Sequence, residues 1–316
     1  MADKYDAISI MPSSLLLSLR LHRTGLIMRI EGYWLASGIL GVTAAIMHRV
    51  IRSGADVVVT KSIGPHPRKG HPGPVITSAH GGLVNAVGLT NPGIDAFVDE
   101  IRQLKNENIP VVLSVFGNSP DEIAEVVTKG TEAKPDAFEL NLSCPHAEIG
   151  LISHSPKLTY DYVKTVRDIT DIPIYAKITP NASDIEAVAL SAEKAGADAV
   201  VAINTLRGMR IDIYQKRPVL GNLVGGLSGP PVLPVAIRCV YDLFNVLDVP
   251  IIGVGGVTTW KDAIEMHLAG ARAIQIGTAV LKGLDVFSEI KQGVEMYLEE
   301  QGMSSTIDIV GLAGRR

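Results

Sequence analysis

The sequence predicts an α/β protein folded as a (β/α)8 TIM barrel, with eight parallel strands inside a ring of helices. Short apolar runs alternate with helical patterns eight times along the 316 residues. The runs are apolar throughout, which is typical of parallel strands that are covered on both faces. Most of them end in a polar side chain or a glycine, and the carboxyl ends of barrel strands are where such folds carry their function.

The predicted elements follow one another in a regular order. We expect strands over residues 33–37, 56–61, 110–115, 137–141, 174–177, 199–204, 250–254 and 273–277. We expect helices over residues 43–53, 94–106, 120–129, 157–169, 183–195, 232–246, 259–269 and 284–301. A doubly wound open sheet is the alternative, but the Rossmann phosphate fingerprint is missing after the first strand.

Three of the predicted helices end in a similar phrase, at residues 53–56, 195–198 and 269–272. Each phrase places Gly-Ala directly after the helix. Glycine adopts the left-handed conformation that ends a helix without steric cost, and alanine lets the next strand pack closely. The phrase therefore predicts a sharp helix-to-strand turn at each position.

Composition sets limits on the function. The chain is 47% hydrophobic and 20% charged, with a formal net charge of −4, which is typical of a globular protein and gives no reason to expect a nucleic-acid partner. No stretch reaches the roughly 18 apolar residues of a membrane span. Two cysteines make no disulfide framework, so we expect a reducing cytoplasm.

The domain organisation follows from the barrel pattern. Although the length alone suggests two domains, barrels of this size commonly form one, so residues 28–316 are expected to be a single barrel domain. Residues 1–27 are expected to be an extension of uncertain status. Their Leu-rich part, residues 13–21, is too short and lacks the cleavage site of a signal peptide.

The stretch Glu139-Leu-Asn-Leu-Ser-Cys-Pro-His146 is the first candidate for chemistry. It ends an apolar strand in polar groups, and Pro145 then stops the strand. Cys144 has no companion at a metal-ligand interval, so we interpret its thiol as a nucleophile or general base, with a free pKa of about 8.5. A cluster that caps a following helix is the alternative. Cys239 lies in an apolar helical pattern and is expected to pack in the core.

Glycine pairs and lysines end other strands. Gly253-Val-Gly-Gly256 and Gly277-Thr278 close the seventh and eighth strands, the usual phosphate position of a barrel. Residues 225–229 are expected to add a flexible glycine loop, and residues 63–82 a long loop over the mouth. Lys61 and Lys177 could stabilise negative charge on a bound ring, or could be lysines that extend to the surface.

Taken together and in order, these motifs resemble the class 1 dihydroorotate dehydrogenases over residues 34–280. The segment from Asn204 to Asp212, followed by Arg217-Pro218, is most similar to the catalytic subunit of the NAD-linked class 1B group. The segments that carry the resemblance are Ala36-Ser-Gly-Ile-Leu-Gly41, Thr60-Lys-Ser62, Asn85-Ala-Val-Gly-Leu-Thr-Asn-Pro-Gly93, Glu139-Leu-Asn-Leu-Ser-Cys-Pro145, Lys177-Ile-Thr-Pro-Asn181, Ile203-Asn-Thr205, Gly225-Gly-Leu-Ser-Gly-Pro230 and Gly253-Val-Gly-Gly256.

The resemblance implies an FMN-dependent enzyme that oxidises dihydroorotate to orotate in pyrimidine biosynthesis. It implies that Cys144 is the base that removes a proton from C5, while a hydride passes from C6 to N5 of FMN. The implied substrate residues are Asn85, Val87, Gly88, Leu89, Asn141, Asn204 and Thr205. The implied FMN residues are Ser37, Lys61, Ser62, Asn118, Asn141, Lys177, Ile203, Ser228, Gly229, Gly255, Gly256, Gly277 and Thr278.

One residue departs from the family pattern, because His146 stands where the family usually has asparagine. An imidazole can still donate a hydrogen bond to a carboxylate, and in its protonated form it would also favour the thiolate of Cys144. We therefore expect substrate binding to survive the change.

The resemblance also implies a partner subunit that carries FAD and a 2Fe-2S cluster and passes electrons to NAD, around a homodimer or a heterotetramer core. This chain has too few cysteines to hold such a cluster itself. Fumarate or a quinone are the alternative acceptors. The alternative functions are a dihydropyrimidine dehydrogenase-like flavin reductase and a phosphate-binding barrel without redox chemistry.

Overall fold

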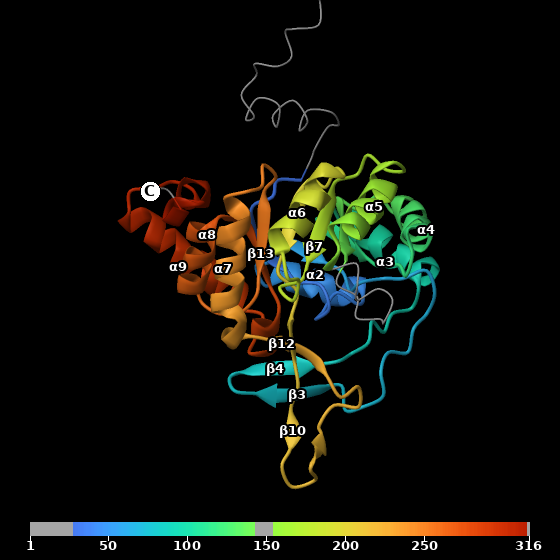
Figure 1. The fold of residues 1–316 in the computed structure, drawn as a ribbon. Helices are drawn as coiled ribbons and strands as arrows, with labels where there is room; N and C mark the ends of the chain where they lie inside the picture. Colours follow the sequence, from blue (N-terminus) through green and yellow to red (C-terminus); the bar gives the residue numbers. More distant parts are fainter. Residues whose placement is uncertain (1–27, 143–153, 315–316) are drawn as a thin grey trace, which may run out of the picture.

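Eight parallel strands close into a barrel at the centre of the molecule, in a computed structural model that describes residues 28–142 and 154–314 (Figure 1). Each strand pairs in parallel with the next around the ring, and the last pairs with the first. In ring order the strands are β1 (Gly32–Leu35), β2 (Val57–Val59), β5 (Val111–Val115), β6 (Ala137–Asn141), β7 (Ile174–Ile178), β8 (Ala199–Ala202), β13 (Ile251–Val254) and β14 (Ala271–Ile276). The predicted (β/α)8 fold is confirmed.

Helices surround the barrel, one after each strand. They are α2 (Ala44–Arg52), α3 (Ile94–Asn106), α4 (Pro120–Thr131), α5 (Pro156–Arg167), α6 (Ile185–Lys194), α7 (Leu233–Phe244), α8 (Trp260–Ala269) and α9 (Val286–Glu300). Short 3-10 turns are η2 (Pro230–Val232), η3 (Thr278–Leu281), η4 (Thr306–Ile309) and η5 (Leu312–Gly314). Hydroxyl or carboxylate caps begin five of the helices by accepting a backbone N–H, and these caps are Thr43, Ser119, Ser155, Asp184 and Thr259.

The glycines predicted to end helices do so. Gly54, Gly196 and Gly270 follow α2, α6 and α8 with φ of 105°, 104° and 128°. These values lie in the left-handed region, which an L-residue enters only with strain. The phrase found in the sequence therefore marks three real helix ends.

A repeated carboxylate contact fastens the amino ends of neighbouring strands. In each case an aspartate just before one strand accepts a backbone N–H at the start of the neighbouring strand. The same aspartate also pairs with a Lys or Arg side chain from a nearby helix. The three sets are Asp56 with Tyr33 and Lys291, Asp136 with Val111 and Lys105, and Asp198 with Ile174 and Arg167. Because they lie at the amino ends of the strands, these contacts belong to the stability of the barrel and not to its chemistry.

The barrel interior is filled by side chains. Trp34 and Tyr175 are fully buried there with ring centroids 6.1 Å apart, in one cluster with Val112, Val201 and Ile252. A second and larger cluster lies between the strands and the helices, and Cys239 is part of it, as predicted. The barrel is therefore a packed core and not a channel.

A small antiparallel sheet stands over the carboxyl ends of the strands. Its order is β3 (Ile76–Ala79), β4 (Gly82–Asn85), β12 (Gly225–Ser228) and β9 (Leu206–Gly208). The prediction of a flexible loop at 225–229 was wrong, because residues 225–228 form β12, paired on both edges. Residues 63–82 likewise contain β3 in addition to loop. Glycine-rich strands have little propensity of their own and are held here by their neighbours.

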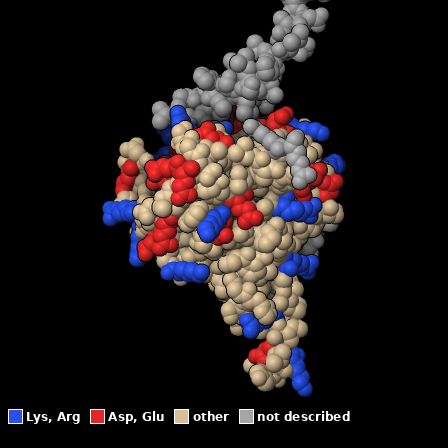
Figure 2. All heavy atoms as spheres, turned by 90° about the vertical axis from the view of Figure 1, so that its left-hand side faces the viewer, with Lys and Arg blue, Asp and Glu red and all other residues tan. Residues whose placement is uncertain are grey.

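Beyond this sheet a hairpin of β10 (Ile211–Asp212) and β11 (Arg217–Pro218) projects furthest from the barrel (Figure 1). Figure 2 shows charged side chains on the flank of the barrel and again toward the tip of the projecting part, with uncharged surface between them. Large apolar side chains are exposed along the projecting part, with Tyr214 at 89%, and the others are Ile76, Met209, Ile211, Ile213 and Leu223.

Two further observations complete the fold. The predicted strand at 199–204 is shorter than expected, since β8 ends at Ala202. Among the helices of residues 28–142 and 154–314, none has the length and apolar character to cross a bilayer. The predicted extension, residues 1–27, lies outside the described part of the chain.

One buried histidine joins the outer face of the barrel to the helices. His267 of α8 is fully buried, with Nδ1 2.7 Å from the carbonyl oxygen of Ala271 and Nε2 3.3 Å from the hydroxyl of Tyr33. A carbonyl only accepts, so Nδ1 carries the proton and Nε2 accepts from Tyr33. Burial lowers the pKa of His267 to about 4, because the charged ring would lose its hydration.

We predict that His267 makes the fold sensitive to acid. The unfolded chain binds a proton near its ordinary pKa of 6.5 and the folded chain only near 4, so stability is complete above about pH 6.5 and is lost as the pH falls toward 4. The full loss is about 3 kcal/mol. The variant His267→Asn should lose stability at pH 8 but show a flatter decline from pH 7 to pH 4 in urea unfolding. An equally steep decline in both proteins would contradict this.

Candidate active site

Polar side chains form a hydrogen-bonded line across the carboxyl ends of four strands. The hydroxyl of Ser37 lies 3.4 Å from that of Ser62, and the Asn141 amide donates to Ser62 at 3.0 Å. The Asn204 amide in turn donates to Asn141 at 3.4 Å. These residues follow or end β1, β2, β6 and β8. The structure therefore brings four of the predicted site residues together at the mouth, as parallel strands ending on one face require.

Below this line lies a closed triangle of buried polar side chains. Lys177 Nζ donates to Glu139 Oε1 at 3.3 Å and to Gln275 Oε1 at 3.2 Å. Gln275 Nε2 donates to Glu139 Oε2 at 2.6 Å. Glu139 is 0% exposed and Lys177 is 5% exposed. Lys177 is in register with Asn141 on the neighbouring strand, so its amine lies beside the polar line.

Lys61, at the end of β2, is in a different situation. Within the described residues, no carboxylate pairs with its amine and no side chain bonds to it. Burial lowers the pKa of Lys61, because the charged amine has lost part of its hydration. A bound anion would relieve that cost.

Three glycine segments meet at the ends of β12, β13 and β14. A Cβ placed on Gly256, which has φ of 80°, would lie 2.5 Å from the backbone nitrogen of Leu233, the first residue of α7. A Cβ on Gly229 would lie 3.4 Å from the Thr278 methyl, and the Thr278 hydroxyl bonds to Ser228 at 2.9 Å. Gly255 and Gly277 complete the set of predicted residues here. The Leu233 N–H already donates to the Pro230 carbonyl and residue 234 is a proline, so an anion here would be met by the glycine backbone and by the hydroxyls of Ser228 and Thr278.

Asn85 and Thr205 meet at the antiparallel sheet. The Asn85 amide donates to the carbonyl of Gly226 at 3.3 Å, and a Cβ on Gly226 would lie 2.0 Å from the Thr205 hydroxyl. Asn181 bridges to the same place, since it donates to the carbonyl of Thr205 at 3.1 Å. Two of the predicted substrate residues are thus held on either side of one glycine.

The loop from Val87 to Leu89 lies against the histidine of the preceding loop. The backbone N–H of His71 donates to the Val87 carbonyl at 3.2 Å, and a Cβ on Gly88 would lie 2.6 Å from the same nitrogen. Gly88 and Leu89 both have positive φ, 78° and 55°. The backbone of this loop is therefore fixed by close packing.

The remaining predicted residues lie apart from these groups or outside the description. Ile203 is buried, with its N–H bonded to Val254. Asn118 is exposed, and its described hydrogen bonds go to Glu122 of α4 and not to another site residue. Cys144 and His146 fall within residues 143–153, outside the described residues, so their predicted roles stay predictions.

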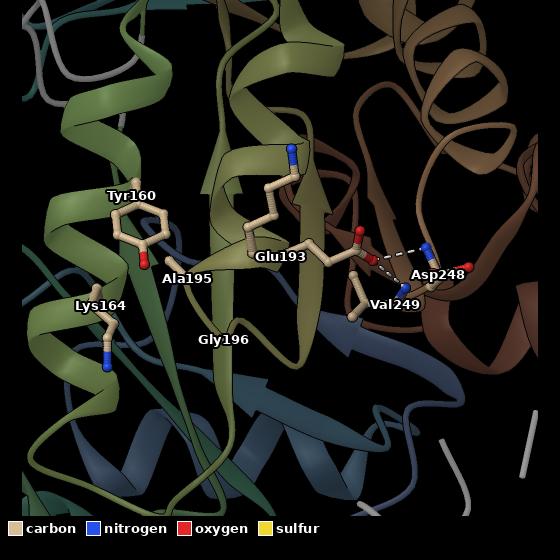
Figure 3. A pocket seen from close by; sticks show the side chains of 8 residues that line it. Tyr160, Lys164, Glu193, Ala195, Gly196, Asp248 and Val249 are labelled. Carbon is tan, nitrogen blue, oxygen red and sulfur yellow. Dashed lines mark hydrogen bonds between the residues drawn. The ribbon is translucent and has the colours of Figure 1, made fainter. Parts of the chain in front are cut away.

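A hollow of about 390 Å³ lies at the opposite end of the barrel, by the amino ends of β8 and β13 (Figure 3). Glu193 there accepts the backbone N–H groups of Asp248 and Val249, both at 2.8 Å. Tyr160 and Lys164 form its other wall. It shares no residue with the predicted site. In the described parts of the chain, no three His, Cys, Asp or Glu side chains are grouped to hold a metal.

The comparison with protein families decides what kind of barrel this is. The profile described as dihydroorotate dehydrogenase matches residues 30–298. The chain belongs to the dihydroorotate dehydrogenase family.

Among this family, relatives named as the catalytic subunit of dihydroorotate dehydrogenase B (NAD(+)) are similar along most of their length. The protein of Pyrococcus abyssi is 54% identical over 282 residues, which cover 88% of this chain and 94% of the relative. That of Methanosarcina mazei is 51% identical over 283 residues, which cover 88% and 90%. The resemblance to the class 1B catalytic subunit is confirmed.

A solved structure of a dihydroorotate dehydrogenase from Eimeria tenella, described in complex with ferulenol, shares the fold. It is 21% identical, with a TM-score of 0.78 over 96% of this chain and 95% of that one. At this identity the likeness supports the barrel architecture alone.

Within this dihydroorotate dehydrogenase fold, sequence reasoning gave no role to Glu139 and Asn181, although both stand in the quoted motifs, and it missed Gln275 altogether. Glu139 and Gln275 each interrupt an apolar strand two residues before a predicted site residue, Asn141 and Gly277. That spacing was the available signal, because residues two apart in a strand point to the same side. A charged side chain in a buried strand needs a partner, and this one has two.

We predict that Gly256→Ala lowers the free energy of unfolding by about 1–3 kcal/mol, because the new methyl group meets the start of α7 and the backbone is left-handed. Gly208→Ala is the matched control, since its Cβ would meet only Leu227 at 3.6 Å. Urea unfolding of the two variants measures the difference. Equal stability of both variants would show that the close approach at Gly256 is unimportant.

Proposed function

We propose that the protein is an FMN-dependent dihydroorotate dehydrogenase that oxidises dihydroorotate to orotate in pyrimidine biosynthesis. The proposal rests on family membership, and the observation that carries it is the line from Ser37 to Asn204, which has two amides beside Lys177, with Lys61 next to Ser62 in the chain. FMN, when bound, supplies the acceptor for the hydride that leaves the substrate. The remaining chemistry belongs to residues of the chain.

The residues present fit FMN in two respects. The glycine segments at the ends of β12, β13 and β14 keep the backbone free of side chains beside the hydroxyls of Ser228 and Thr278, which suits a phosphate. Lys61 is partly desolvated and has no carboxylate partner within residues 28–142 and 154–314, which suits a site that receives negative charge. In the proposed site, Ser228, Gly229, Gly255, Gly256, Gly277 and Thr278 hold the phosphate end, and Ser37, Lys61, Ser62, Asn141, Lys177 and Ile203 the ring end. Asn118 is the residue that the geometry supports least.

Substrate would be held by amides. Asn141 and Asn204 are already joined to each other, and Asn85 and Thr205 approach from the antiparallel sheet. Amides both donate and accept, which suits a ring that carries alternating carbonyl and N–H groups together with a carboxylate. The loop of Val87, Gly88 and Leu89 adds a rigid wall.

In the proposed mechanism Cys144 removes the C5 proton as a thiolate. It follows Asn141 by three residues in the sequence. His146 would donate to the substrate carboxylate and favour the thiolate in its protonated form.

We predict that Cys144→Ala reduces dihydroorotate oxidation by about 10²- to 10⁴-fold while FMN stays bound. Cys239→Ala, on the buried face of α7, is the matched control and should retain activity. The measurement is orotate formation together with flavin absorbance of the purified protein. Retained turnover in the Cys144 variant would remove the thiol from the mechanism, and reduction of uracil in place of dihydroorotate oxidation would favour a dihydropyrimidine dehydrogenase-like activity.

The electron acceptor is proposed from the names of the relatives, which are catalytic subunits of an NAD(+) enzyme. Such a name implies a second subunit, for which we propose FAD and a 2Fe-2S cluster. The chain itself would form the homodimeric core of that assembly in the cytoplasm.

We predict that the isolated chain reduces a soluble dye with dihydroorotate but does not reduce NAD, and that NAD reduction appears when the partner subunit is added. The test compares NAD, fumarate and a quinone as acceptors, with and without the subunit recovered by affinity capture. Rapid NAD or fumarate reduction by the chain alone would contradict the proposed assembly.

A further inference from the structure

The triangle of Glu139, Lys177 and Gln275 crosses the barrel just below the mouth. Glu139 lies on β6 and Gln275 on β14, which are on opposite sides of the ring of eight strands. Below the triangle the interior is apolar, beginning with Tyr175 and Trp34. The triangle is therefore the polar floor of the site, and the deepest place where a ligand in the mouth meets charge.

Within the described residues, every side-chain nitrogen and oxygen of the floor has a hydrogen-bond partner, but Lys177 still has an N–H group left over. Glu139 uses one oxygen for Lys177 and the other for Gln275, and Gln275 uses both ends of its amide. The amine of Lys177 has three N–H groups, and among the described residues two of them donate hydrogen bonds. The third remains for a ligand. Because both other bonds are fixed, its direction is fixed as well.

Charge is distributed unequally between the two lysines of the mouth. Lys177 lies 3.3 Å from a fully buried carboxylate, so the pair is close to neutral when seen from the mouth. Lys61 has no such partner among the described residues. As far as the described residues show, Lys61 is the one of these two cations that presents uncompensated positive charge to a ligand.

We propose that Glu139 is a positioning residue that aims Lys177 and cancels its charge, leaving Lys61 to supply the net positive charge that stabilises reduced FMN. This rests on the proposed function. Lys177 then acts on FMN as a hydrogen-bond donor of fixed direction, and Gln275 holds the second oxygen of Glu139. The two lysines therefore have different roles, although both stand at the ends of barrel strands.

The ratio of affinities for reduced and oxidised FMN tests the charges directly. Glu139→Gln removes the negative charge and keeps the shape, so this ratio should rise at least tenfold, which is an upward shift of about 30 mV in a two-electron potential. Lys177→Gln should lower the ratio, because it leaves the carboxylate uncompensated. The double variant should lie between them and closer to the wild type than either.

Two controls separate charge from structural damage. Glu193→Gln makes the same exchange in the hollow at the other end of the barrel and should leave the potential unchanged. Lys61→Gln should lower the potential and should do so equally in the wild type and in the double variant. A merely structural role of Glu139 would reduce stability without shifts of opposite sign.

The measurement is the midpoint potential of bound FMN by equilibration with a reference dye, together with the dissociation constant of oxidised FMN. A single variant could fail to fold because a buried charge has lost its partner. In that case the test uses the double variant of Glu139→Gln and Lys177→Gln, which has no buried charge at this place. A double variant whose potential falls as far as that of Lys61→Gln overturns the inference, as does an unchanged potential in Glu139→Gln. A wild-type chain that takes up no FMN overturns the proposed function and the inference together.

Discussion

The parallel pairing of β1 with β14 is the contact on which the rest of the site depends. Residues Gly32–Leu35 lie in register with Ala273–Ile276, and this ladder turns a curved sheet into a closed ring. Closure brings the carboxyl ends of all eight strands to one face. The polar site residues, which are spread along the sequence from Ser37 to Thr278, meet only because this pairing exists. Without it Gln275 could not reach Glu139 across the ring.

Much of the fold follows from the sequence because each local signal agrees with the closed form. Apolar runs, helix caps such as Ser119 and the glycine after α2 all indicate the same strand and helix boundaries. The small sheet over the mouth was beyond such reasoning. Gly225 and Gly226 carry no strand propensity, and β12 exists because β4 and β9 supply partners from distant parts of the chain.

The site shows the same division. Motifs at strand ends predicted Ser62, Asn141 and Asn204, and the structure joins them by hydrogen bonds. The contacts of Glu139 and Gln275 were not predicted. A sequence shows to which side of a strand a side chain points, but not which side chain it meets across the barrel. The weakly supported Asn118 illustrates the opposite case, since its bonds to Glu122 are those of a residue that helps to begin α4.

The filled interior has a kinetic meaning. Since Trp34, Tyr175 and their neighbours fill the barrel, a ligand at the mouth of the described fold has no path through the interior. Under the proposed function, substrate, product and any small oxidant would all enter from the mouth, so a small oxidant is expected to compete with orotate. An oxidant that is itself a protein takes electrons without entering, and is free of this competition. The identity of the electron carrier therefore determines the form of product inhibition.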